Sequence, residues 1–226
     1  MAAVQRQLRV LVLDCGGITN PDCEAGMAAV AAAMGVTEEE ATLGHKTAWS
    51  LARSDRTFTK YWEHTFKTAG VPPGARTKER AAACEAALGV ALRVSYPDSL
   101  EAAGWAKSQG VVVGVISNHL VAPPLFDYCS AGAGLAALVS DPSLLVVSQA
   151  VGLGKPDPAI YQLFFDRLLK LHPEATSADL CFVDDKEKNC AAALALGWRA
   201  IHYDARKAGP GELRKRIVHE LELCDA

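Results

Sequence analysis

Short apolar runs alternate with helical segments along most of this chain, and this alternation limits its fold more than any other feature. Two parallel strands need a long crossover between them, usually a helix. Strands that alternate with helices therefore predict a parallel sheet covered by helices on both faces, which is an α/β fold. The runs rich in β-forming residues span 8–13, 111–116, 135–139, 180–183 and 200–203.

Helix signals lie between these runs. Asp98 and Glu101 form a capping-box pattern, which predicts a helix that starts at Asp98. Asp157 followed by Pro158 predicts a second helix start. The apolar face of that second helix is expected to consist of Ile160, Phe164, Leu168 and Leu171. Further helices are predicted at about 191–196 and 211–223.

The connection between the first two runs is too long for a single helix. More than ninety residues lie between them, whereas an ordinary crossover connection takes about a dozen residues or somewhat more. Residues 21–89 look helical throughout, with breaks near Gly35, Ser54 and 70–74. We expect an inserted helical cap domain of four helices at 20–91, over the strand ends where open α/β sheets bind ligands. The core domain is then 1–19 and 92–226.

Composition and charge favour a small-molecule partner. The 226 residues are 50% hydrophobic and 22% charged, and the formal net charge is −3. This charge provides no attraction for nucleic acid or an anionic membrane. No apolar stretch reaches the roughly 18 residues of a spanning helix, and residues 1–7 are too short and polar for a signal peptide. We expect a cytoplasmic protein without nucleic-acid or membrane partners, and its oligomeric state is left open.

The seven cysteines do not form a recognisable framework. Their number is odd and no Cys-x-x-Cys pair occurs, so we expect neither a zinc cluster nor a set of disulfides. Cys15 would need an arginine six residues later to head a thiol-phosphatase loop. Position 21 is proline, which excludes that reading.

Polar residues follow the first two predicted strands. Asp14 comes directly after the first, ahead of Cys15 and two glycines, where it is either a catalytic carboxylate or a turn cap. Ser117 and Asn118 follow the second strand. Their hydroxyl and amide, together with free backbone N–H groups, suit phosphate oxygens, although Ser-Asn is also a common helix cap.

Two later segments bring charge to the same predicted edge. Lys155 is fixed among Gly and Pro residues just before a predicted helix. There it can neutralise an anionic intermediate, although a solvated surface lysine is the ordinary alternative. Asp184 and Asp185 follow the run at 180–183. Adjacent carboxylates repel unless a cation or hydrogen-bond donors compensate them, and their oxygens suit Mg²⁺.

In this order, the four motifs resemble those of the haloacid dehalogenase-like hydrolase superfamily. The matching segments are strand-Asp14, strand-Ser117-Asn118, Gly152-Leu153-Gly154-Lys155-Pro156-Asp157-Pro158 and strand-Asp184-Asp185. The resemblance covers about 8–203. It implies a Rossmann-like parallel sheet as the core, and the helical insert resembles the superfamily's type-one cap.

The resemblance also implies a role for each matched residue. Asp14 corresponds to the nucleophile that forms an aspartyl-phosphate, and Lys155 to the lysine that offsets the charge of nucleophile and phosphate. Ser117 corresponds to a catalytic group that binds the transferring phosphoryl oxygens, assisted by Asn118 and Cys15. The implied Mg²⁺ ligands are Asp14, Asp184, Asp185 and the backbone carbonyl of Gly16.

The chain departs from the superfamily's pattern at Gly16. A typical phosphatase of the superfamily has a second aspartate there, which protonates the leaving oxygen. Because general acid catalysis contributes roughly 10²–10⁴-fold, we expect slow hydrolysis of esters with poor leaving groups. Candidate substitute acids are Asp22, Glu24, His45 and His119, each of which also has an ordinary solvated or capping explanation.

Three functions stay open at this point. The favoured one is a Mg²⁺-dependent phosphatase of a small phosphorylated metabolite, with weakened or rerouted acid catalysis. The second is a catalytically silent binding or regulatory protein. The third is a haloacid dehalogenase, whose halide leaves without a proton. Substrate specificity is expected to lie in the cap, where candidate residues are Lys46, Trp49, Arg53, Arg56, Lys60, Tyr61 and Trp62.

Overall fold

The computed structural model describes residues 8–55, 60–92, 94–119 and 135–223. Their strands form one parallel sheet in the order β3-β2-β1-β4-β5. In register, Val10 of the central strand lies opposite Val112 on one side and Leu180 on the other. The carboxyl ends of β2, β1 and β4 therefore lie side by side. The strands are β1 (Val10–Leu13), β2 (Val112–Ser117), β3 (Leu145–Val147), β4 (Leu180–Asp184) and β5 (Arg199–His202).

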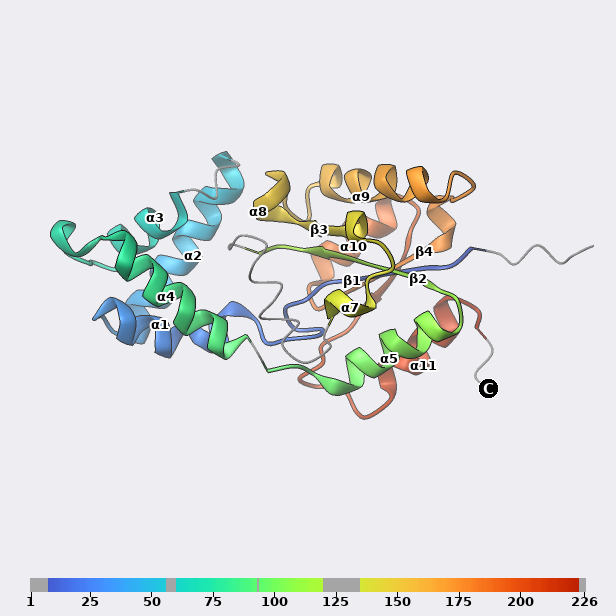
Figure 1. The fold of residues 1–226 in the computed structure, drawn as a ribbon, viewed down its shortest axis with the longest axis horizontal. Helices are drawn as coiled ribbons and strands as arrows, with labels where there is room; N and C mark the ends of the chain where they lie inside the picture. Colours follow the sequence, from blue (N-terminus) through green and yellow to red (C-terminus); the bar gives the residue numbers. More distant parts are fainter. Residues whose placement is uncertain (1–7, 56–59, 93, 120–134, 224–226) are drawn as a thin grey trace, which may run out of the picture.

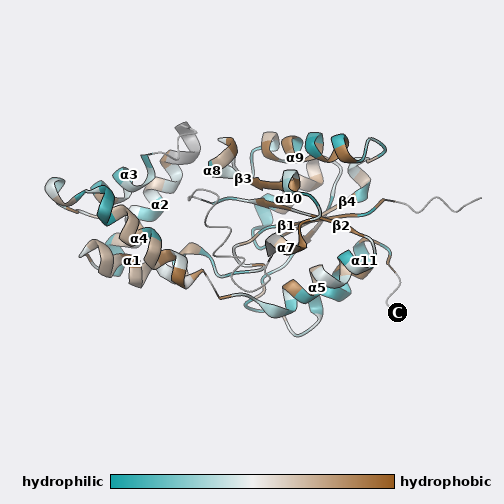
Figure 2. Cartoon of the chain, in the orientation of Figure 1, coloured by the Kyte–Doolittle hydropathy of each residue, from teal (hydrophilic) through white to brown (hydrophobic). Residues whose placement is uncertain are grey.

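Helices cover both faces of this sheet. Successive side chains of a strand point to opposite faces, and Leu11 and Leu13 of β1 pack in one apolar cluster with α5 (Pro97–Ser108) and α11 (Glu212–Glu220). Val10 and Val12 pack in a second cluster with α9 (Pro158–Leu171) and α10 (Glu187–Ala195). Figure 1 shows these two pairs of helices on opposite sides of the strands, which are strongly hydrophobic in Figure 2. The predicted α/β fold with a Rossmann-like parallel sheet is confirmed.

The predicted strand at 135–139 is wrong. Residues Leu135–Leu138 form the short helix α7, as suits a Leu-Ala-Ala-Leu sequence of strong helix formers. The outer strand beside β2 is instead β3, which the sequence analysis missed because it has only three residues. It is followed directly by α8 (Ser148–Val151), and the 3₁₀ helices of the core are η4 (Pro142–Leu144) and η5 (Ser177–Asp179).

Two details of the helix predictions also need correction. Helix α5 begins at Pro97, and Asp98 lies inside its first turn without capping it. The Asp98 carboxylate instead accepts a hydrogen bond from the Gly211 backbone N–H. Asp157 does cap α9, since its Oδ1 accepts from the Ala159 N–H at 2.9 Å. Leu171 is 41% exposed because α9 ends there, so it is not part of the buried face.

The helices inserted between β1 and α5 have an apolar core of their own. Met27, Phe66 and Leu88 belong to one buried cluster of this group, which contains no strand residue among those described. Figure 1 shows the group beyond the carboxyl ends of the strands. We call it the cap helices: η1 (Cys23–Gly26), α1 (Met27–Met34), α2 (Glu38–Asp55), α3 (Tyr61–Thr68), η3 (Pro73–Ala75) and α4 (Lys78–Ala91). The domain boundaries at 20 and 91 stay predictions.

The two chain segments that join core and cap helices are fastened to each other. The buried Asn20 side chain donates from Nδ2 to the carbonyl oxygens of Leu92 and Val94, both at 3.0 Å. Next to it, the Tyr96 N–H donates to the Thr19 carbonyl at 2.8 Å. These bonds hold together the segment that leaves the sheet for the cap helices and the segment that returns from them. Within the described ranges, no helix combines the length and apolar character needed to cross a membrane.

We expect Asn20→Ala to lower the free energy of unfolding by about 2 kcal/mol, because the buried Leu92 carbonyl and the partly buried Val94 carbonyl lose their donor. Urea denaturation measures this change. Gln162→Ala, which removes an exposed amide bonded to Asp166 on the same helix, is the control and should change stability little. If Asn20→Ala lowered the free energy of unfolding no more than this control, the Asn20 hydrogen bonds would not contribute to stability.

Candidate active site

The predicted motifs meet at the carboxyl edge of the sheet. Asp14 follows β1, and its backbone N–H donates to the Val183 carbonyl of the neighbouring strand at 2.9 Å. Ser117 is the last residue of β2 and Asp184 the last of β4. Because β1 lies between β2 and β4, the topology alone brings these three side chains together.

Lys155 lies between two carboxylates at this edge. Its Nζ is 2.8 Å from Oδ1 of Asp14 and 2.7 Å from Oδ2 of Asp184. All three side chains are buried. A surface lysine, the ordinary alternative for this position, is therefore excluded.

Burial and charge act in opposite directions on this triad. Burial raises the pKa of Asp14 to about 7, with Lys155 opposing the shift and Asp184 adding to it. Burial alone would lower the pKa of Lys155, but the two carboxylates together raise it. Despite its burial, the pKa of Asp184 lies below the ordinary value, because Lys155 and several hydrogen bonds stabilise the charged form. A further positive charge beside Asp14 would favour its ionised, nucleophilic form.

Asn118 holds the segment that carries Lys155. Its Oδ1 accepts from the Lys155 backbone N–H at 2.7 Å, and its Nδ2 donates to the Lys155 carbonyl at 2.9 Å. The side-chain amide predicted to bind phosphate is thus engaged in fixing the lysine. In contrast, the Ser117 hydroxyl has no hydrogen-bond partner among the described residues and lines a small cavity beside Cys15, so it is available to a ligand. The Cys15 backbone N–H donates to Asp14 Oδ1 at 2.7 Å.

Asn189 is a site residue that the sequence analysis missed. It is buried, and its Nδ2 donates to both carboxylate oxygens of Asp184, at 2.9 and 3.1 Å. The Lys186 backbone N–H adds a third bond to Asp184 Oδ1 at 2.8 Å. Asp184 is therefore saturated with donors. The signal for Asn189 was its place in the first turn of the helix that follows the aspartate pair.

The three aspartates satisfy the requirements of a metal site. Asp14, Asp184 and Asp185 each offer an oxygen, and these atoms lie within 4.8 Å of one another. Oδ1 of Asp185 is buried and accepts no hydrogen bond from the residues that the structure describes, although Lys186 Nζ lies 3.6 Å from it. A buried carboxylate oxygen without a hydrogen-bond donor is costly, and a directly bound cation would compensate that cost. Because Asp184 is already saturated, Asp14 and Asp185 are the better direct ligands, and hard oxygen donors of this kind suit Mg²⁺.

Gly17 is required by the approach of Asp185. Its φ of +75° lies in the left-handed region that favours glycine. A Cβ at this position would lie 2.6 Å from the Asp185 carboxyl carbon. Gly17 of the first motif therefore makes room for Asp185 of the last motif.

Asp185 and Asp22 share a pair of cations. Oδ2 of Asp185 is 3.4 Å from Arg206, which also lies 3.4 Å from Asp22 Oδ2. Lys186 bridges the same two carboxylates at 3.5 and 3.6 Å. Burial, rather than these partners, determines the raised pKa of Asp185. No local sequence signal marked Arg206, which lies after β5 and reaches the site only in the folded chain.

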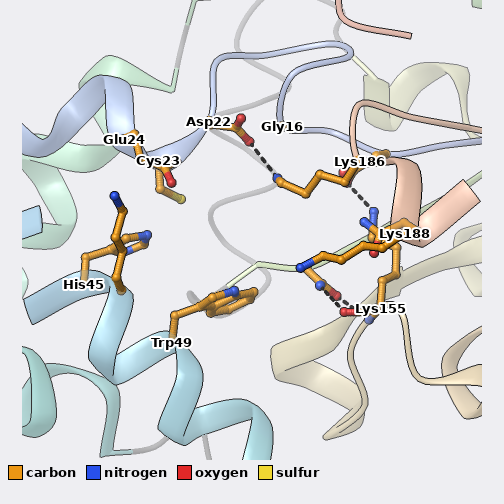
Figure 3. Close-up of a pocket in the computed structure, with 13 residues that line it drawn as sticks. Gly16, Asp22, Cys23, Glu24, His45, Trp49, Lys155, Lys186 and Lys188 are labelled. Atoms are coloured by element: carbon orange, nitrogen blue, oxygen red, sulfur yellow. Dashed lines mark hydrogen bonds and ion pairs between the residues drawn. The ribbon is translucent and has the colours of Figure 1, made fainter. Parts of the chain in front are cut away.

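A pocket of about 260 Å³ opens between core and cap helices. Its core wall includes Asp14, Gly16 and Lys155. Figure 3 shows that His45 and Trp49 of α2 face it from the cap side. The pocket thus joins the buried aspartate to the cap helices predicted to govern specificity.

The candidate substitute acids fall into two groups. Asp22, Glu24 and His45 line the pocket. Asp22 is the one nearest the missing side chain, because its Oδ1 lies where a Cβ at Gly16 would stand. His119 does not line this pocket, and burial lowers its pKa to about 4, so the ring is uncharged at neutral pH and poorly suited to donate a proton.

Of the cap residues proposed to govern specificity, only some line the pocket. Lys46 and Trp49 line the pocket, whereas Lys60 does not. Tyr61 and Trp62 pack within the cap helices, as core residues. The side chains of Arg53 and Arg56 lie outside the described residues.

Comparisons with known proteins agree with this architecture. No model of a known protein family matches the chain. A phosphatase of Mycobacterium tuberculosis is 29% identical over 139 residues, which are 61% of this chain and 57% of that protein. The chain thus matches little more than half the length of this curated relative.

Solved structures share the fold over nearly the whole chain. An L-2-haloacid dehalogenase has a TM-score of 0.64 at 15% identity and covers 96% of this chain and 99% of its own. A haloacid dehalogenase family enzyme of Bacteroides thetaiotaomicron, in complex with magnesium and inorganic phosphate, has a TM-score of 0.61 at 16% identity, covering 89% and 97%. The fold implied by the four motifs is therefore confirmed.

The buried His119 should make stability depend on pH. Its folded pKa of about 4 lies below the ordinary value of 6.5, so the unfolded chain binds the proton more readily between these values. Stability then falls as pH falls through this window, by up to about 3 kcal/mol at its acid end. His119→Asn should remove this part of the difference between unfolding free energies at pH 7 and at about pH 4.5.

Chemical denaturation at the two pH values measures the effect. The exposed His219 provides the matched control, and His219→Asn should retain the wild-type dependence. If His119→Asn also retained it, burial of His119 would not be the cause.

Proposed function

We propose that this chain, which has the fold of the haloacid dehalogenase-like superfamily, is a Mg²⁺-dependent phosphatase of a small phosphorylated metabolite. The observation that carries the proposal is the buried Asp14–Lys155–Asp184 arrangement beside an Asp185 oxygen that accepts no hydrogen bond from the described residues. Such a site collects a nucleophilic carboxylate, a fixed positive charge and metal-ligating oxygens in one place. Phosphoryl transfer requires this kind of positioning and charge neutralisation more than elaborate covalent chemistry.

Each residue then has a distinct task. An oxygen of Asp14 attacks phosphorus and forms an aspartyl-phosphate, while the bond to the leaving alkoxide breaks. Lys155 contacts Asp14 and offsets negative charge as the phosphoryl group arrives. The Ser117 hydroxyl donates to a phosphoryl oxygen, and Asn118 positions Lys155 through its backbone. Water then hydrolyses the aspartyl-phosphate and releases phosphate.

Asp14 and Asp185 would hold Mg²⁺, with Asp184 next to them and Gly16 on the pocket wall. When bound, the ion supplies positive charge that draws the phosphate oxygens toward Asp14 and stabilises charge in the transition state. Asp184 serves mainly to hold Lys155, because its two oxygens already accept hydrogen bonds from Lys155, Lys186 and Asn189.

The retained aspartate pair also favours a phosphatase over a haloacid dehalogenase. Displacement of halide by a carboxylate needs no metal, so a buried, partly orphaned Asp185 would carry an energetic cost without a use. A silent binding protein would equally have no need for a lysine desolvated beside the nucleophile.

Asp14→Asn should abolish hydrolysis of an activated aryl phosphate such as para-nitrophenyl phosphate. The amide is a poor nucleophile, and we expect a loss of at least about a thousandfold in kcat with Mg²⁺ present. Asp166→Asn, an exposed carboxylate on α9, is the matched control and should retain full activity. Equal rates in wild type and Asp14→Asn would overturn the proposed function.

Positions 16 and 22 offer a test of the missing acid. A side chain at 16 meets the Asp22 carboxylate, so Gly16→Asp alone should gain little. The double change Gly16→Asp with Asp22→Ala should raise kcat for an alkyl phosphate by about a hundredfold, and change aryl phosphate turnover much less, because an aryloxide leaves without full protonation. Turnover numbers for both ester types in the two single variants and the double variant decide this. No gain for the alkyl ester in the double variant would show that the site cannot use an acid at 16.

A further inference from the structure

The pocket holds two kinds of lysine. Lys155 is paired with Asp14 and Asp184, and Lys186 is paired with Asp22 and Asp185. Lys46 and Lys188 line the same pocket but make no ion pair or hydrogen bond within the part of the chain that the structure describes. The pocket thus contains two cations whose charge is not used to hold the site together.

These two lysines come from opposite walls. Lys46 belongs to α2 of the cap helices, and Lys188 to the first turn of α10 in the core. In Figure 3 the Lys188 side chain extends from α10 toward the cap wall, on which Trp49 stands. Asp14 lines the same pocket as the two lysines. A ligand attacked by Asp14 would therefore reach the space between Lys46 and Lys188.

The rest of the cap wall is suited to an organic molecule rather than to bulk water. Trp49 presents an indole ring, and it lies one helical turn from His45, which places both on one face of α2. His45 is fixed because its Nδ1 lies 2.6 Å from the Tyr61 hydroxyl. Burial lowers the pKa of His45, so this part of the wall is uncharged at neutral pH. The free positive charge on the pocket wall is that of Lys46 and Lys188.

We propose that these two lysines bind a second anionic group of the substrate. The natural substrate is then a compact molecule with a phosphate ester at one end and a carboxylate or second phosphate at the other. The inference rests on the proposed function, since the ester end is the phosphate attacked by Asp14. A volume of about 260 Å³ suits such a compact metabolite. Glu24 on the cap wall opposes the second anion, and its removal should favour binding.

The test compares three probes that differ at one end. They are propyl phosphate, the same ester with a terminal carboxylate, and the same chain with a terminal second phosphate. We expect kcat/KM in the wild type to be about tenfold higher or more for at least one charged analogue than for propyl phosphate, because charge-assisted hydrogen bonds to the lysines add to binding. The analogue preferred identifies the second group as carboxylate or phosphate.

Variants assign the preference to its residues. Lys188→Gln and Lys46→Gln should each reduce the ratio of kcat/KM between the charged analogue and propyl phosphate by roughly three- to tenfold, whereas Glu24→Gln should increase it. Lys215→Gln, an exposed lysine of α11 outside the pocket, should leave all values unchanged. Equal kcat/KM for the three probes, or a ratio unaffected by both pocket variants, would overturn the inference.

This failure is distinguishable from failure of the proposed function. Hydrolysis of propyl phosphate without any preference would contradict the second anion site and leave the phosphatase intact. Absence of hydrolysis of all three probes and of the activated aryl phosphate would contradict the phosphatase. In that case calorimetric dissociation constants of the same probes still decide the inference, since tighter binding of a charged analogue, lost in Lys188→Gln, supports it and equal binding overturns it.

Discussion

The ion-paired triad of Asp14, Lys155 and Asp184 is the interaction on which the rest of the carboxyl edge depends. A lysine buried between two carboxylates is costly unless its geometry is good and the remaining oxygens have donors. Asn189 and the Lys186 N–H supply those donors for Asp184, and Asn118 fixes the backbone of Lys155. Removing Lys155 would leave two buried carboxylates without the cation that they share. The residues around Asp14 therefore stabilise one another.

The strand order brings the members of this triad together at one edge of the sheet. β1 has β2 and β4 as neighbours, so residues more than a hundred positions apart meet without any special loop. The cap helices then close the edge from the other side, held by the bonds of Asn20 to Leu92 and Val94. The buried charged groups are thus contributed by the sheet edge, and the opposite wall of the pocket is contributed by the cap helices. The two parts have separate apolar cores, so substitutions inside the cap can alter the wall without disturbing the triad.

The sequence predicted those features that follow from local pattern combined with sheet topology. Asp14, Ser117, Lys155 and Asp184 were identified because each follows an apolar run or precedes a capped helix, and parallel strands bring such ends together. Features determined by tertiary packing were not accessible. The strand at Leu145–Val147 is too short to separate from a loop, and the run at 135–139 is apolar enough for a strand although its Leu and Ala residues prefer a helix. The use of the Asn118 amide on Lys155 and the arrival of Arg206 beside Asp185 have no counterpart in local sequence.

The approach of Asp22 to Gly16 gives the glycine a different meaning. Read as sequence, Gly16 is a missing proton donor. In the folded chain it leaves room beside Asp14 for the first residues of the cap segment. A side chain at 16 would require the Asp22 carboxylate to move. The residue tolerated at 16 is therefore coupled to the ion pairs of Asp22 with Lys186 and Arg206, which hold that carboxylate in place.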